Sequence, residues 1–302
     1  MLAPVVLFVY NRPQHTIKTI EALSANKLAK ESNIFIFSDA ARSENSVEVQ
    51  AVRDYIDSIR EKNYFKSVTI NKAELNKGLA KSVIEGVSEI INEYGEVIVL
   101  EDDLISAPDF LTYMNDALKY YKDLEKIWSV SGYNIPIKIP ENYKDEIYYS
   151  YRGCSWGWAT WENRWSQVDW FVEDYEKFKK NKSLRKQFNR GGRDMANMLD
   201  AQMEGNINSW AIRWCYSQWK KNLLTVYPVK SRIKNIGLDG SGTHSGVTSH
   251  YDVKLNENLI KCTLTDPKIN KRILKNFQNH YGTSFDFRVI ELKRLIKKFL
   301  RM

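Results

Sequence analysis

The sequence predicts an α/β fold of the Rossmann-like kind, a mostly parallel twisted sheet with helices on both faces. Short continuous apolar runs are typical of strands buried on both faces, and here they alternate with segments of helical periodicity. That alternation favours a doubly wound parallel sheet. The chain has 302 residues, 43% of them hydrophobic and 27% charged, which allows a sizeable core.

The elements of this sheet follow one another over the first hundred residues. Strands are expected at residues 4–10 (PVVLFVY), 34–37 (IFIF), 68–70 (VTI) and 97–100 (VIVL). Helices are expected at residues 15–23, 47–60 and 79–91, where apolar side chains recur at helical spacing. Asn11-Arg12-Pro13 turns the chain between the first strand and the first helix.

Polar residues stand at the ends of three of the four strands. They are Asn11-Arg12, Asp39 and Glu101-Asp102-Asp103. The carboxyl ends of parallel strands share one edge of the sheet, and ligands of open α/β sheets bind outside that edge. The pattern therefore predicts a ligand-binding edge.

The three consecutive carboxylates after the fourth strand repel one another unless water or a cation compensates their charge. Carboxylate oxygens at such an edge suit Mg²⁺ or Mn²⁺, which also hold substrate phosphates. The alternative is a solvated acidic turn before a helix, because Ser106 and Pro108 are typical helix-start residues.

The second half of the chain is rich in aromatic residues. All nine tryptophans lie between Trp128 and Trp219, and residues 148–165 read YYSYRGCSWGWATWENRW. Buried core packing explains most single tryptophans. A cluster with interleaved polar residues favours a cleft where rings stack on a sugar. Nucleic-acid bases are a rival partner, but the stretch holds few basic residues to follow a phosphate backbone, so no nucleic-acid partner is expected.

A glycine-rich segment at residues 235–246 (NIGLDGSGTHSG) predicts a lid. Backbone N–H groups and hydroxyls of such a loop can close over phosphates. The segment lacks the GxxxxGK[ST] pattern, which excludes a P-loop. The alternative is a flexible surface loop.

Bulk features indicate a cytoplasmic protein. The start of the chain lacks signal-peptide regions, no apolar run approaches about 18 residues, and three separated cysteines suit reduced thiols. The formal net charge is +8, and residues 288–302 set six basic side chains against Glu291 at helical spacing. This tail is expected either to contact an anionic membrane surface, at the inner face of the plasma membrane, or to complete the core as a closing helix.

Together these motifs resemble the GT-A superfamily of nucleotide-sugar-dependent glycosyltransferases. The eukaryotic likeness is to the β-1,2-N-acetylglucosaminyltransferase family, and a family of bacterial envelope-polysaccharide glycosyltransferases looks closer still. The motifs that carry the resemblance span residues 4–246: the Asn11-Arg12 turn, Ser38-Asp39, residues 99–104 with 107–110, residues 131–134, the aromatic segment, and residues 227–246.

The resemblance implies a role for individual positions. Contacts to the nucleotide are expected from Tyr10, Asn11, Arg12, Asp39, Lys77, Lys81, Glu101 and Asp102. Asp103 is expected to bind Mn²⁺ or Mg²⁺ directly, and His244 to complete the metal shell. Ser241 and Thr243 are expected in a lid over the diphosphate. The acceptor is expected to meet Trp156, Trp158, Trp210 and Arg213.

The sequence departs from the family pattern at the catalytic base. An acid is expected immediately before a tryptophan at a helix start, but Asn208-Ser209 precede Trp210 here. Asp200 and Glu204, with Asp194 as a third, are the upstream candidates, and Asp102 is the further catalytic candidate. The alternative for Asp200 and Glu204 is that each is a solvated acid on a helix. The stereochemical outcome therefore stays open.

The resemblance implies a metal-dependent hexosyl- or N-acetylhexosaminyltransferase. The expected donor is a nucleotide-sugar, UDP-linked by the family pattern, and the expected acceptor is a glycan or a lipid-linked acceptor of surface polysaccharide synthesis. The expected organisation is a donor-binding half at residues 1–125, an acceptor-binding half with the lid at 126–260, and a helical basic tail at 261–302. The alternatives are a sugar nucleotidyltransferase, disfavoured because the first turn has no glycine, and an inactive carbohydrate- or membrane-binding scaffold.

Overall fold

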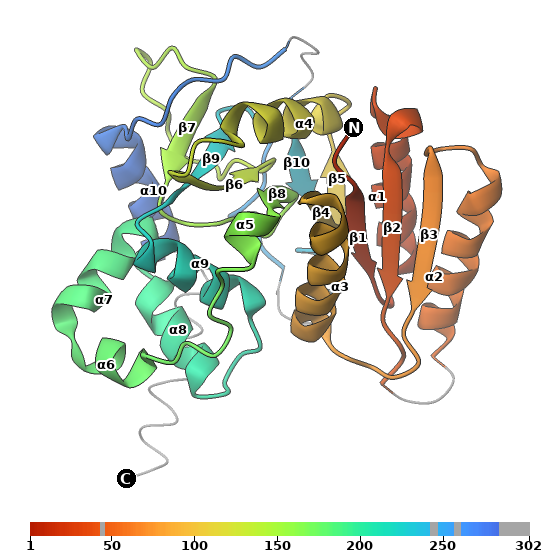
Figure 1. Cartoon of the computed structure of the whole chain (residues 1–302), viewed down its shortest axis with the longest axis horizontal. Helices are drawn as coiled ribbons and strands as arrows, with labels where there is room; N and C mark the ends of the chain where they lie inside the picture. Colours follow the sequence, from red (N-terminus) through yellow and green to blue (C-terminus); the bar gives the residue numbers. More distant parts are fainter. Residues whose placement is uncertain (43–45, 242–246, 257–260, 284–302) are drawn as a thin grey trace.

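The computed structural model describes residues 1–42, 46–241, 247–256 and 261–283 of the chain (Figure 1). Its strands are β1 (Val5–Val9), β2 (Asn33–Ser38), β3 (Ser67–Lys72), β4 (Glu96–Glu101), β5 (Leu104–Ser106), β6 (Ile127–Ser131), β7 (Ile147–Ser150), β8 (Trp158–Trp161), β9 (Leu224–Pro228) and β10 (Ile233–Asn235). Its α-helices are α1 (Pro13–Ser24), α2 (Val47–Ser58), α3 (Leu79–Tyr94), α4 (Phe110–Tyr121), α5 (Glu162–Trp165), α6 (Tyr175–Lys180), α7 (Lys182–Phe188), α8 (Met195–Met203), α9 (Trp210–Lys220) and α10 (Lys271–Thr283).

One eight-stranded sheet organises the molecule, in the order β3-β2-β1-β4-β8-β6-β9-β7. The pairs β1–β2, β1–β4, β2–β3 and β6–β9 are parallel, whereas β8 and β7 run antiparallel to their neighbours. The predicted mostly parallel sheet is confirmed, as are the four expected strands. Because β8 pairs with both β4 and β6, the two halves of the chain contribute to the same sheet.

Alternating side chains of the central strands fill two cores, one on each face of the sheet. Ile98 and Leu100 of β4 pack with residues of α1, α2, α4 and α10, whereas Val97 and Val99 pack with α3, α5 and α9. This period of two is the geometry of a strand that is buried on both faces. Helices therefore cover both faces, as predicted.

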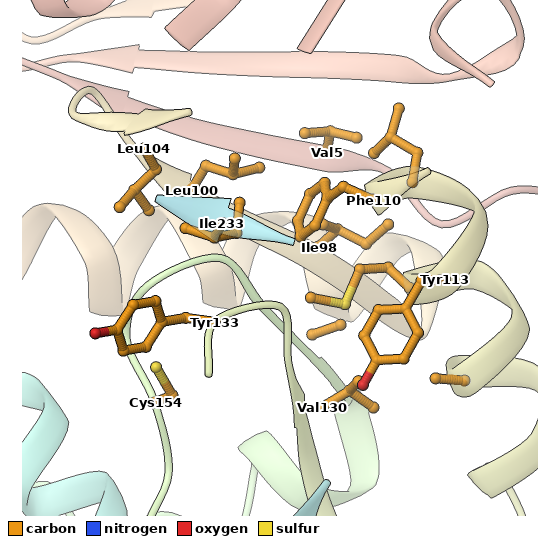
Figure 2. Close-up of a cluster of buried hydrophobic side chains, with 14 of the residues drawn as sticks. Val5, Ile98, Leu100, Leu104, Phe110, Tyr113, Val130, Tyr133, Cys154 and Ile233 are labelled. Atoms are coloured by element: carbon orange, nitrogen blue, oxygen red, sulfur yellow. The ribbon is translucent and has the colours of Figure 1, made fainter. Parts of the chain in front are cut away.

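A small two-stranded sheet supports the turn that carries the acidic residues. β5 pairs antiparallel with β10, with Ile233 opposite Ser106 and Asn235 opposite Leu104. Leu104 and Ile233 are buried beside Phe110 in the cluster drawn in Figure 2. The helix start expected at Ser106 and Pro108 is wrong, because β5 comes first and α4 begins only at Phe110.

Candidate active site

The ends of three neighbouring strands form the candidate site. Val9 of β1 lies opposite Ser38 of β2, and Phe8 lies opposite Glu101 of β4. The residues that follow these strands therefore meet at one edge of the sheet, as the sequence predicts. The turns after β1 and β4 face each other directly, because the backbone N–H of Tyr10 donates to Asp102 Oδ2 at 3.3 Å.

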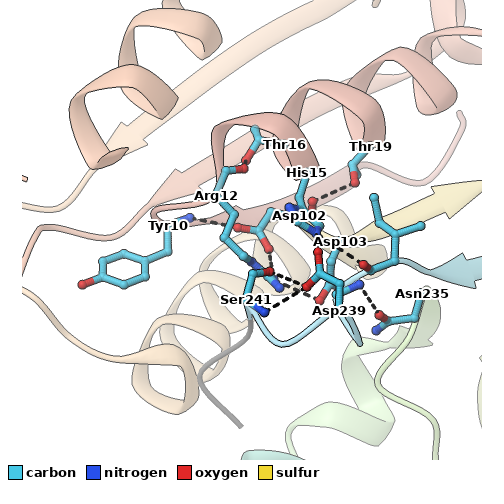
Figure 3. A network of polar contacts seen from close by, with 12 residues as sticks. Tyr10, Arg12, His15, Thr16, Thr19, Asp102, Asp103, Asn235, Asp239 and Ser241 are labelled. Atoms are coloured by element: carbon cyan, nitrogen blue, oxygen red, sulfur yellow. Dashed lines mark hydrogen bonds and ion pairs between the residues drawn. The ribbon is translucent and has the colours of Figure 1, made fainter. Parts of the chain in front are cut away.

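Arg12 links the two aspartates of the acidic turn. Its guanidinium donates to Asp102 Oδ1 and, at 2.9 Å, to Asp103 Oδ2 (Figure 3). The side chains of Arg12, Asp102 and Asp103 are only 17%, 6% and 12% exposed. Thr19 of α1 donates to the Asp102 carbonyl at 2.8 Å, so the backbone of the turn is held as well. Charge-assisted bonds of this kind fix geometry more tightly than bonds between neutral groups.

Burial and mutual repulsion set the charge of the acidic turn. Burial raises the pKa of Glu101 to about 8, with Asp103 and Asp102 adding to the rise and Arg12 opposing it. Burial also raises the pKa of Asp102 to about 6 against the attraction of Arg12. Burial alone would lower the pKa of Arg12, but its two aspartate partners outweigh burial and raise it. Three carboxyl groups and one guanidinium thus share this buried turn.

The segment before the predicted lid packs directly onto Asp103. The backbone N–H of Ile236 donates to the Asp103 carbonyl at 2.9 Å, and the N–H of Gly237 donates to Asn235 Oδ1 at 2.7 Å. A Cβ atom at position 237 would collide with Asp103 Oδ2 and lie 2.7 Å from Arg12 Nη1. Only glycine leaves room here for the ion pair beneath the segment.

His15 and Asp239 fasten the same segment to α1. His15 Nε2 lies 3.3 Å from the Ile236 carbonyl and 3.2 Å from Asp239 Oδ2 (Figure 3). The Ser241 hydroxyl and N–H donate to Asp239 Oδ1 at 2.6 and 2.9 Å, and these bonds lower the pKa of Asp239 to about 2. Ser241 is thus placed near the acidic turn, whereas the expected lid residues Thr243 and His244 lie outside the described residues.

The donor set at the turn fits a divalent cation that one carboxylate and substrate phosphates would share. In the described part of the chain, no group of three or more His, Cys, Asp and Glu side chains is arranged to hold a metal ion. Asp103 gives Oδ2 to Arg12, and its Oδ1 bonds to none of the described residues. Mg²⁺ commonly takes only one or two protein carboxylates and completes its shell with phosphates and water. The residues present therefore fit such an ion without forming a closed cage.

Asp39 lies at the same edge of the sheet, but its carboxylate oxygens accept hydrogen bonds from other groups of the protein. Oδ1 accepts from the N–H groups of Ala40 and Lys77, both at 2.9 Å, and Oδ2 accepts from Gly78 N–H at 2.8 Å and from Asn76 at 3.2 Å. These bonds hold the turn before α3. Lys77 and Lys81 are both directed at Glu85, at 2.7 and 3.7 Å, on the exposed face of α3, and are not brought to the acidic turn.

The predicted acceptor tryptophans separate into two groups. Trp158 and Trp210 are 1% and 3% exposed and pack at 5.2 Å from each other, within a cluster that includes Trp165 and Trp214. They belong to the core on one face of the sheet. Trp156 is half-buried and packs edge-on against Tyr133. Arg213 is half-buried and donates to the Trp170 carbonyl at 3.1 Å.

Two of the three upstream base candidates are held in buried ion pairs. Asp200 is 1% exposed and binds both terminal nitrogens of Arg185 at 2.7 Å, while it accepts from the Tyr175 hydroxyl at 3.1 Å. Asp194 is 4% exposed and pairs with Arg152 at 2.7 Å. The third candidate, Glu204, is exposed, and its Oε1 lies 3.3 Å from Lys179 Nζ.

Sequence reasoning missed four residues that the structure places at the site: His15, Asn235, Gly237 and Asp239. The glycine-rich segment contained three of them, and its pairing through β10 with β5 explains why they reach Asp103. The remaining residue, His15, carried no signal beyond its position in the first turn of α1.

The sheet and its polar edge define the class: an α/β glycosyltransferase fold of the GT-A type. A family model described as the GNT-I family matches residues 1–190, and the chain belongs to this family. This membership places the chain among the glycosyltransferases. Among curated protein sequences none matches significantly.

Solved structures show weaker likeness. S. aureus TarS 1–349 is 12% identical over 77% of this chain and 60% of its own, with a TM-score of 0.43. LgtC, described as a galactosyltransferase in complex with donor and acceptor sugar analogues, is 12% identical over 73% and 72%, with a TM-score of 0.40. GlyE of Streptococcus pneumoniae TIGR4 is 11% identical over 74% and 45%, with a TM-score of 0.37. The chain spans only 25% of the longer TarS chain.

Within the described residues no helix is both long and apolar enough to cross a membrane. The basic segment at residues 288–302, which the sequence assigns to a membrane surface or to core packing, lies outside the described residues.

Proposed function

We propose that this protein transfers a sugar from a UDP-sugar to a glycan or lipid-linked acceptor of surface polysaccharide synthesis, with help from Mn²⁺ or Mg²⁺. The observation that carries the proposal is the Arg12–Asp102–Asp103 assembly at the edge of the sheet, covered by the backbone of Gly237. The UDP donor rests on the resemblance of the surrounding motifs to the family.

The assembly supplies charge where a leaving diphosphate needs it. Asp103 would hold the divalent cation, and such an ion stabilises the charge that builds on the leaving phosphate. Arg12 is a second cationic group at the same point, and its planar guanidinium matches phosphate oxygens in a bidentate way. Preorganised groups of this kind need no reorganisation during the reaction.

In this proposal Asp102 is a positioning residue: it holds the turn after β1 in place. One of its oxygens accepts from the Tyr10 N–H and the other from Arg12. It therefore fixes the turn after β1, where Tyr10, Asn11 and Arg12 would meet the nucleotide. Of the upstream acids, Glu204 is the one that solvent reaches, and we propose it over Asp200 and Asp194 as the residue to test for the base.

The test is a panel of nucleotide-sugars with Mn²⁺, scored by release of free nucleotide. We expect slow hydrolysis of one donor by the wild type and a loss of about a hundredfold or more in Asp103→Ala, the scale of removing one charge-stabilising group. Asp123→Ala is the matched control, because Asp123 is exposed in the loop before β6, at the opposite edge of the sheet. Its turnover should equal that of the wild type.

The outcomes separate the alternatives. A parallel assay supplies a nucleoside triphosphate and a sugar 1-phosphate. Formation of a nucleotide-sugar with release of inorganic diphosphate in that assay would replace the proposal by a nucleotidyltransferase. If no donor turns over, calorimetry with UDP and Mn²⁺ decides: binding that Asp103→Ala abolishes keeps the donor site, with an acceptor required for turnover. Absence of UDP binding by the wild type would refute the proposal.

A further inference from the structure

A groove lies at the carboxyl ends of β6 and β9, away from the acidic turn. Its volume is about 640 Å³, within the roughly 300–1,000 Å³ of small-molecule sites. Three separate chain segments form it: residues 134–139 after β6, 229–231 after β9, and 252–256. None of the individual residues to which the sequence analysis assigns a catalytic, nucleotide, metal, lid or acceptor role lines it.

The walls of the groove are aliphatic. Six branched side chains line it, namely Ile135, Ile137, Ile139, Val229, Val253 and Leu255. In the described part of the chain no tryptophan, tyrosine or phenylalanine is among the lining residues, although aromatic residues make up 13% of the sequence. A sugar-binding surface normally offers a ring face, so these walls favour a flexible hydrocarbon over a sugar.

The polar groups at the floor are already used by the protein. The Asn134 side chain donates to the Val229 carbonyl at 2.6 Å and accepts from the Tyr148 hydroxyl at 2.7 Å. The Ser231 hydroxyl donates to the Ile233 carbonyl at 2.7 Å and accepts from the Asn134 N–H at 2.9 Å. Asn256 donates to Asp109 at 3.2 Å. A ligand that needs several directed hydrogen bonds would find few partners here.

The rim of the groove is cationic. Lys230 and Lys254 line it and are exposed, and exposed Lys138 lies between two of its isoleucines. Asp252 is the acid among the lining residues. An anionic group therefore complements the rim, while the walls complement a branched hydrocarbon.

The groove and the acidic turn share one edge of the sheet. β6 and β9 run parallel to each other, and β8 pairs antiparallel with both β4 and β6, so β4, β6 and β9 all end at this edge. In the strand order β4-β8-β6-β9, β9 stands three positions from β4, which is about 14 Å at about 4.8 Å per strand. A ligand anchored in the groove could extend along the edge toward Asp103.

We propose that this groove binds the hydrocarbon and diphosphate of a polyprenyl-diphosphate carrier, and so holds a lipid-linked acceptor. The inference rests on the proposed function and narrows its acceptor to one chemical class. The branched walls take isoprene units, the rim lysines take the diphosphate, and the attached sugar extends toward the acidic turn.

The test is calorimetric titration of the full chain with farnesyl diphosphate, a short prenyl diphosphate. Leu255→Asp places a charge in the wall, and Lys230→Glu with Lys254→Glu reverses the rim. Each variant should weaken binding by about tenfold or more, because the first loses an apolar contact and the second loses the charge pairs at the rim. Val47→Asp on α2 and Lys221→Glu after α9 are the matched controls, because both side chains are exposed outside the groove. They should bind like the wild type. If Leu255→Asp fails to fold, Val253→Ser replaces it.

Three results would overturn the proposal. The first is an affinity for farnesyl diphosphate that neither groove variant changes. The second is an affinity for farnesol or for inorganic pyrophosphate that equals the affinity for farnesyl diphosphate. The third is binding to phosphatidylglycerol vesicles that the groove variants lose, in a protein that does not bind farnesyl diphosphate. UDP-sugar hydrolysis is measured in parallel and should persist in the groove variants. If the wild type shows neither UDP-sugar hydrolysis nor UDP binding, the proposed function is refuted. If it hydrolyses a UDP-sugar or binds UDP but does not bind farnesyl diphosphate, only the groove proposal is refuted.

Discussion

Replacement of Asp200 distinguishes a structural carboxylate from a catalytic one. The side chain is 2% exposed and binds Arg185, which is 19% exposed, through two bonds of 2.7 Å. Removing one partner of a buried ion pair costs about 3–5 kcal/mol, because the other charge stays buried. Arg185 retains some contact with water, so we expect Asp200→Asn to lower the free energy of unfolding by about 3 kcal/mol.

A loss of that size is measurable by thermal and urea unfolding. At roughly 2 °C per kcal/mol for a chain of this length, Asp200→Asn should lower Tm by roughly 6 °C. The companion variant combines Arg185→Met, Asp200→Leu and Tyr175→Phe, which removes the pair together with the hydroxyl that donates to it. Replacing a whole buried pair with apolar residues is often neutral or stabilising. This variant should therefore recover most of the lost Tm.

Activity of the two variants then completes the test. If Asp200 is structural, the triple variant keeps nucleotide release near the wild-type rate at a temperature where it is folded. A rate at least a hundredfold lower in the stable triple variant would show that the carboxylate takes part in the chemistry. A Tm change below 1 °C in Asp200→Asn would refute the argument from burial.

Three further predictions follow from the same structure. Gly237→Ala should reduce donor turnover by about a hundredfold with little change in Tm, because the methyl group displaces Asp103, and an unchanged rate would contradict the packing described here. Trp158→Ala should cost about 3–5 kcal/mol in urea unfolding, as for a large core side chain, and a loss under 1 kcal/mol would mean that the ring is not buried. Burial, with help from His250 and Arg152, lowers the pKa of His280 to about 4 from its ordinary 6.5, so the unfolded chain takes up the proton first. Stability should therefore fall as pH drops from about 6.5 to 4, and His280→Phe should flatten that part of a Tm-against-pH curve.

The sequence predicts the sheet and the acidic edge because both are local patterns. Apolar runs mark β1, β2, β3 and β4, and the polar residues after them lie within three positions of each strand end. Once parallel pairing is assumed, the carboxyl ends of these strands share one edge, so Arg12 and Asp102 are expected at that edge. The contact between them also requires β1 and β4 to be neighbours, and that long-range pairing comes from the structure.

The aromatic half is less predictable because burial there depends on packing between distant segments. The pattern around Trp158 suits a sugar-binding cleft or a core equally well. The structure decides for the core by bringing α9, with Trp210 and Trp214, across β8. Asp200 shows the same limit, because its partner Arg185 lies fifteen residues earlier on a different helix.

The aliphatic groove could not be predicted from the sequence, because it forms only when separate segments pack together. About ninety residues of sequence separate its first segment from its second, and about twenty separate the second from the third. No single segment indicates a groove by its sequence. They meet because β6 and β9 pair in parallel, which brings the ends of both strands to the edge that carries Asp103. One edge of this sheet therefore carries both the acidic turn that Arg12 holds and the apolar groove with lysines at its rim.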